Sequence, residues 1–124
     1  MTVLSEIGQI AVTAKDIDRA IAFYRDKLGM KFLFQAPPQL GFFSCGSVRL
    51  MLAVPEKKEL DHPASVIYYR VADVQVAYQE LSSRGVRFTG EPAVVHRTDE
   101  HELWIAAFED SEGNTLALMS EKTR

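Results

Sequence analysis

The alternation of apolar and polar residues predicts the same order of elements twice along the chain. In the first half, residues 7–13 read as a strand, and Asp16 follows as the N-cap of a helix. The buried face of this helix is predicted to hold apolar side chains at helical spacing, namely Ile17, Ala20, Ile21, Tyr24 and Leu28. Gly29 supplies a left-handed C-cap. Three strand-like segments follow at residues 31–35, 41–45 and 48–54.

The second half restarts this pattern after a polar stretch. Residues 55–64 contain two prolines and no sustained period, which is typical of a connector. A strand is predicted at residues 65–71. A second helix follows, with Asp73 as its N-cap and Gly85 as its C-cap. Three further strands are predicted at residues 87–95, 102–108 and 114–120, and the polar residues 96–101 form a hairpin region.

The two halves align with each other residue by residue. Asp16 and Asp73 are separated by 57 residues, whereas Gly29 and Gly85 are separated by 56, so the second helix lacks one residue. A two-copy repeat of mixed secondary structure indicates a pseudo-symmetric pair of modules. In each module the helix should cover one face of a four-stranded sheet and leave the other face for a ligand.

Composition and charge narrow the class of protein. The chain has 124 residues, 47% of them hydrophobic, which is enough for one ordinary domain. The net charge is -3 and the basic residues are scattered, so we expect no nucleic-acid partner. Cys45 is the only cysteine, which fits a reducing compartment. With no basic leader and no apolar run of about 20 residues, we expect a cytoplasmic protein without a membrane partner.

Two segments resemble known signatures of the vicinal oxygen chelate superfamily, which includes glyoxalase I, bleomycin-resistance proteins and extradiol dioxygenases. They are residues 16–30, D-I-D-R-A-I-A-F-Y-R-D-K-L-G-M, and residues 108–118, F-E-D-S-E-G-N-T-L-A-L. The resemblance implies an α+β fold in which two tandem βαβββ modules form a curved, cup-like mixed sheet with helices on the outer face. It implies one domain over residues 1–124, with module one at about 5–54, a linker at 55–64 and module two at about 65–121. A homodimer is also implied, and modules pair either within one chain or between two.

The resemblance also indicates where a metal would be held. The family's enzymes generally bind one divalent ion through four positions, which fall here on Gln9, Met51, Val66 and Ala117. Only Gln9 offers a donor, because thioether, valine and methyl side chains do not replace His and Glu as ligands of a hard or borderline ion. We therefore expect no metal cofactor at the usual site.

A relocated metal site is the alternative. His96, His101 and Glu102, together with Gln9, have the donor types that suit zinc, iron, nickel or manganese. Because His101 and Glu102 are adjacent, a regular strand would direct them to opposite faces, so only one can face the ligand. His96 could also act without a metal, as a general acid or base.

Three functions remain open from the sequence. The first is binding of a small apolar or aromatic molecule in the cup, with no metal. The predicted ligand-binding side chains are Gln9, Arg49, Met51, Val66, Tyr68, Trp104, Ala117 and Met119. The second is a lyase, isomerase or dioxygenase that uses His96 or a relocated divalent metal. The third is an accessory dimer without a ligand.

Overall fold

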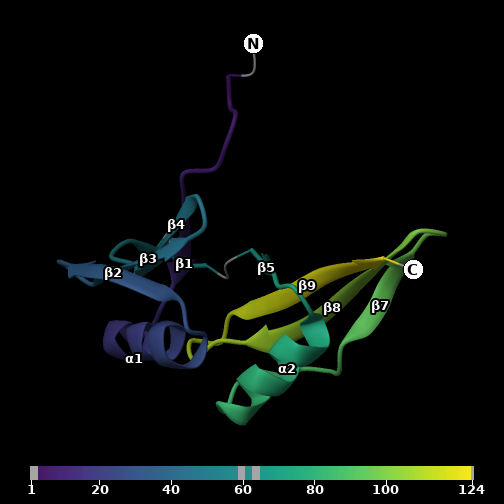
Figure 1. Cartoon of the computed structure of the whole chain (residues 1–124). Helices are drawn as coiled ribbons and strands as arrows, with labels where there is room; N and C mark the ends of the chain where they lie inside the picture. Colours follow the sequence, from purple (N-terminus) through teal and green to yellow (C-terminus); the bar gives the residue numbers. More distant parts are fainter. Residues whose placement is uncertain (1–2, 59–60, 63–64, 124) are drawn as a thin grey trace. The chain divides into compact units, whose positions relative to one another are not determined.

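The computed structural model describes residues 3–58, 61–62 and 65–123 and divides into two compact units, residues 1–64 and 65–124. Each unit contains its own sheet and its own helix, and the two are called module one and module two below (Figure 1). The α+β class and the order of elements predicted for both halves are confirmed. Within the described part of the chain, no helix is long and apolar enough to cross a membrane.

Module one is a four-stranded sheet with a helix on one face. Its elements are β1 (Gln9–Thr13), α1 (Ile17–Ala22), η1 (Phe23–Lys27), β2 (Lys31–Ala36), β3 (Leu40–Cys45) and β4 (Val48–Ala53). The strand order is β1-β4-β3-β2, with β1 parallel to β4 and the other pairs antiparallel. The Asp16 carboxylate accepts a hydrogen bond from the Arg19 amide at 3.0 Å, as expected of an N-cap. Helix α1 packs against β3 and β4 over a core that includes Tyr24 and Phe43.

Module two repeats this arrangement with one interruption. Its elements are β5 (Ile67–Arg70), α2 (Val74–Ser83), β6 (Arg87–Phe88), β7 (Ala93–Arg97), β8 (His101–Glu109) and β9 (Thr115–Thr123). Strand β5 runs parallel to β9, and β6 and β7 both pair with β8. The strand predicted over residues 87–95 is thus broken between Phe88 and Ala93. Pro92 lies in the break and has no N–H to donate to a neighbouring strand.

The one-residue difference between the two helices has a direct structural cause. Helix α1 continues into η1, a π-helical turn in which the Leu28 amide donates to the Phe23 carbonyl. A π-turn accommodates one extra residue within an α-helix. The hydrogen bonds at the two helix ends show the same one-residue insertion. In module one the Met30 amide donates to the carbonyl of Tyr24, six residues earlier. In module two the Val86 amide donates to the carbonyl of Leu81, only five residues earlier. The extra residue therefore lies on the exposed surface of η1, among Arg25, Asp26 and Lys27.

A buried aspartate holds the turn between β8 and β9. The Asp110 side chain is 5% exposed, and its Oδ1 accepts from the amides of Glu112 and Asn114, each at 2.8 Å. Its Oδ2 accepts from Asn114 Nδ2 at 2.8 Å. Gly113 adopts a φ of 86°, a left-handed conformation that favours glycine. These contacts form the turn that joins β8 to β9.

Candidate functional site

Strand alternation in module one separates a core face from a face without a helix. Leu50 and Leu52 of β4 are buried on the side of α1, so Arg49 and Met51 project to the opposite side. We call this opposite side the helix-free face of module one. The register of β1 with β4 sets Gln9 beside Arg49, and Ala11 beside Met51, on this face.

The helix-free face contains a cavity of about 330 Å³. This size lies within the range of roughly 300–1,000 Å³ typical of small-molecule sites. Its lining is mainly apolar and comes from β1, β3, β4 and the stretch after β4, with Ala11, Leu40, Met51, Ala53, Val54 and Pro55 among the residues. Met51, one of the four positions at which the sequence resemblance implied a metal ligand, forms part of the wall.

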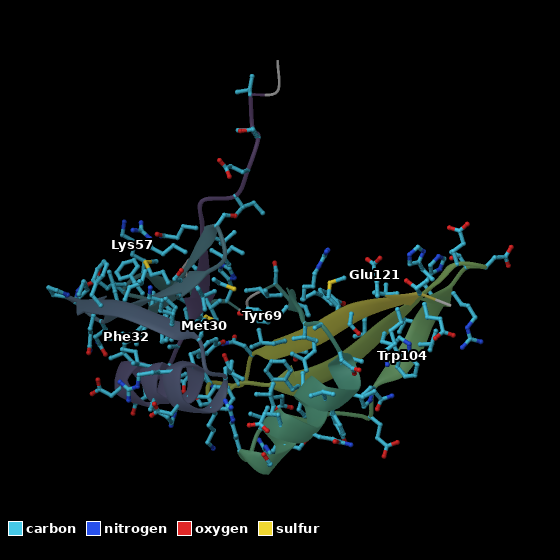
Figure 2. All side chains as sticks on the ribbon, viewed as in Figure 1. Met30, Phe32, Lys57, Tyr69, Trp104 and Glu121 are labelled. Atoms are coloured by element: carbon cyan, nitrogen blue, oxygen red, sulfur yellow. The ribbon has the colours of Figure 1, made fainter. Side chains whose placement is uncertain are left out.

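The polar residues of this cavity are concentrated at the connector. Thr13, Glu56, Lys57 and His62 line it, and the Thr13 hydroxyl donates to the His62 carbonyl at 3.4 Å. Lys57 lies on the side of the sheet away from α1 (Figure 2). Sequence reasoning missed Glu56, Lys57 and His62, because residues 55–64 have no period that predicts where their side chains point. Only Thr13 carried a signal, since it shares strand parity with Gln9 and Ala11.

A fixed arginine lies next to this cavity on the same face. Arg49 Nε donates to Gln9 Oε1 at 2.6 Å, and the guanidinium carbon lies 5.2 Å from the centroid of the Phe42 ring. Phe42 in turn stacks on Phe34, with centroids 4.6 Å apart and planes at 27°. Gln9 Nε2 donates to Met51 Sδ at 3.8 Å. The amide of Gln9 therefore links Arg49 to the wall of the cavity.

The predicted residues of module two occupy two different faces. Tyr68 pairs with Ala117, and Arg70 pairs with Met119. The Ser120 hydroxyl accepts a hydrogen bond from the Val74 amide at the start of α2. Ala117 and Met119 therefore project away from α2, because Ser120 projects toward it. Val66, directly before β5, and Tyr68 are 44% and 51% exposed. Their part in ligand binding stays a prediction.

Trp104 lies on the opposite face from Ala117. It pairs with Ser120 and therefore shares the side of the sheet covered by α2 (Figure 2). Its Nε1 donates to Glu102 Oε1 at 3.3 Å, and Lys122 Nζ lies 4.8 Å from the ring centroid. The structure thus does not bring Trp104 together with Tyr68, Ala117 and Met119 on one face of this sheet.

Among the candidate metal donors of module two, Glu102 is separated from the two histidines. His96 lies opposite Leu103 across a β-bulge, on the face of Ala117, and His101 shares that parity. Glu102 projects to the other face, where it forms an ion pair with Arg97 at 2.7 Å. Among the residues that the structure describes, no group of three or more His, Cys, Asp or Glu side chains is placed to hold a metal ion.

Comparisons with known proteins show the family and the fold of this chain. Residues 6–118 match the family described as the Glyoxalase/Bleomycin resistance protein/Dioxygenase superfamily. YurT of Bacillus subtilis is 28% identical over 132 residues, which cover 90% of this chain and 95% of that protein. Among solved structures, lactoylglutathione lyase from Agrobacterium tumefaciens has a TM-score of 0.74 at 23% identity, with 96% of each chain covered. TnmS3, an antibiotic binding protein from Streptomyces sp. CB03234, has a TM-score of 0.77 at 20% identity and covers 98% of this chain and 100% of its own.

Proposed function

We propose that this chain, which belongs to the Glyoxalase/Bleomycin resistance protein/Dioxygenase superfamily, binds a small apolar or aromatic molecule in the cavity of module one. The observation that supports this function is the cavity itself, with a volume of about 330 Å³ and a mainly apolar lining. Removal of apolar ligand surface from water contributes about 25 cal/mol per Å², so such a wall supplies affinity without coordination. Thr13, Glu56, Lys57 and His62 supply the few polar groups that orient a ligand.

The residue types at the family's metal positions favour the same function. Met51 supports an apolar wall, and Val66 and Ala117 offer no donor atom at the other positions. TnmS3 is described as an antibiotic binding protein, which fits a binding role for the fold. A homodimer, and a ligand contact of Tyr68 and Met119 on their own sheet in module two, are also part of the proposal.

A fluorescence titration with N-phenyl-1-naphthylamine, a neutral aromatic probe, tests this function. At about 0.3 kcal/mol per non-hydrogen atom, the probe should bind with a dissociation constant on the order of 100 µM. Ala11 lines the cavity with an exposed side chain, so Ala11→Phe should fill part of it and weaken binding about tenfold or more.

Ala72→Phe is the matched control, because Ala72 is exposed before α2 and does not line this cavity. It should bind the probe like the unsubstituted protein. Saturable binding that Ala11→Phe leaves unchanged would place the probe elsewhere and contradict the proposed cavity. The absence of saturable binding to the unsubstituted protein would favour an accessory role without a ligand.

An enzyme is the second candidate, and the position of His96 favours it. His96 is exposed on the helix-free side of module two, where an acid or base would be accessible to a substrate. The similarity to lactoylglutathione lyase supports a lyase of this fold. Metal analysis of protein purified without chelator separates the two functions. A stoichiometric divalent ion that disappears in Gln9→Ala or His96→Ala would replace the binding function with metal-dependent catalysis.

A further inference from the structure

We infer that the ligand of module one is an organic acid, in which an apolar or aromatic body occupies the cavity and an anionic group binds Arg49. This inference rests on the proposed function and adds the charge of the ligand to it. The anionic group is expected to be a carboxylate, because the guanidinium group matches carboxylate geometry and binds it through two parallel hydrogen bonds.

The guanidinium group of Arg49 is held in place before any ligand arrives. Its Nε donates to Gln9 Oε1 at 2.6 Å, and its central carbon lies 5.2 Å from the centroid of the Phe42 ring. Phe42 is 9% exposed and is itself stacked on Phe34, so the support beneath the arginine is firm. A positively charged fork that is already oriented loses less conformational entropy on binding than a free side chain does.

Arg49 differs from other arginines of the chain in its charge partners. Arg25, Arg84 and Arg97 each have a carboxylate oxygen within 3.0 Å. No carboxylate among the described residues forms an ion pair with Arg49, whose polar contact is the neutral amide of Gln9. The two Nη atoms of Arg49 therefore remain available as charged donors on the helix-free face.

The surroundings of Arg49 fit one end of an elongated ligand. Arg49, Ser44 and Ser47 are among the residues that line a second hollow, of about 270 Å³. Met51 of the first cavity is two residues further along the same strand, a separation of roughly 7 Å. A ligand of moderate length can thus place its anionic group at Arg49 and its apolar body against Met51, with the hydroxyls of Ser44 and Ser47 as further donors.

Two related probes isolate the contribution of the charge. 1-Anilinonaphthalene-8-sulfonate has the ring system of N-phenyl-1-naphthylamine plus one anionic sulfonate. Arg49→Gln removes the positive charge and should weaken sulfonate-probe binding about ten- to hundredfold, the range expected for hydrogen bonds to a charged group. Binding of the neutral probe should change by less than about twofold, because its contacts are apolar. Added salt should weaken sulfonate-probe binding to the unsubstituted protein more than to Arg49→Gln.

Two control variants keep the outcome clear. Arg87→Gln removes an arginine whose side chain is 85% exposed in module two, and it should not alter binding of either probe. Arg49→Lys keeps the charge but loses the fork, and it should retain more sulfonate-probe binding than Arg49→Gln. Circular dichroism of each variant establishes that it is folded.

The results distinguish this inference from the proposed function. If Arg49→Gln weakens both probes equally, or leaves the sulfonate probe unchanged in a folded protein, the acid ligand is wrong while the apolar cavity stands. If the neutral probe fails to bind the unsubstituted protein saturably, the proposed function is wrong and the acid ligand falls with it.

Discussion

The turn between β8 and β9 depends on one buried carboxylate, so Asp110→Ala should destabilise the fold strongly. The substitution removes the acceptor of three hydrogen bonds of 2.8 Å, from the amides of Glu112 and Asn114 and from the Asn114 side chain. Asp110 is 5% exposed and Glu112 is 6% exposed, so water cannot readily replace the lost acceptor. The hydrogen bond from the Asp110 amide to the Asn114 carbonyl remains.

The structure gives the size of the effect. Hydrogen bonds to a charged group contribute roughly 1.5–3 kcal/mol each, and bonds that share one acceptor are not additive. We expect Asp110→Ala to lower the free energy of unfolding by about 3–5 kcal/mol. Natural domains have only about 5–15 kcal/mol in total, so the variant should be close to the limit of folding.

Urea unfolding followed by circular dichroism measures this loss, and two variants control it. Asp99→Ala removes an exposed aspartate from the turn between β7 and β8 and should cost less than about 0.5 kcal/mol. Asp110→Asn keeps one acceptor oxygen, but its new amide group donates where the Asn114 amide also donates. The stability of Asp110→Asn should therefore lie between those of Asp110→Ala and Asp99→Ala. A loss below about 1 kcal/mol in Asp110→Ala would refute the role assigned to this carboxylate.

Two further predictions concern module one. A Cβ at Gly41 would lie 2.8 Å from Ile21 Cγ1, so Gly41→Ala should lower the free energy of unfolding by about 1–3 kcal/mol in the same assay. Gly8→Ala, which meets nothing within 4 Å, should be near neutral, and equal effects would contradict the clash. Deletion of Asp26 should convert the π-turn into α-helix and preserve cooperative thermal unfolding, whereas deletion of Arg19 rotates the apolar stripe and should abolish it. Loss of folding in the Asp26 deletion would contradict this origin of the repeat mismatch.

Much of the fold could be predicted because local signals and tertiary packing agree. Asp16 and Asp73 are N-caps, and Gly29 and Gly85 adopt positive φ at the helix ends, as the sequence predicts. The missing residue in the second helix was visible in the repeat, but its cause was not. A π-turn and an α-turn present similar apolar patterns over so few residues, so periodicity alone does not separate them.

The site was less predictable, because faces depend on register. The number of residues in the turn at Asp110 sets the register between β8 and β9. A shift of this register by one residue would move Trp104 to the face of Ala117. The cavity was hidden for another reason. His62 and Lys57 line it from a stretch without regular structure, where neither spacing nor propensity gives the direction of a side chain.

The repeat explains why the proposed anionic ligand would bind in module one and not in module two. Gln9 and Arg49 are paired across β1 and β4, and the corresponding positions of module two are Val66 and Thr115. An anion that leaves water must regain its hydrogen bonds and charge partners, which valine and one neutral hydroxyl do not provide. The helix-free face of module two therefore lacks the charged donor that Arg49 supplies in module one. The divergence between the two copies of the repeat limits the proposed acid site to module one.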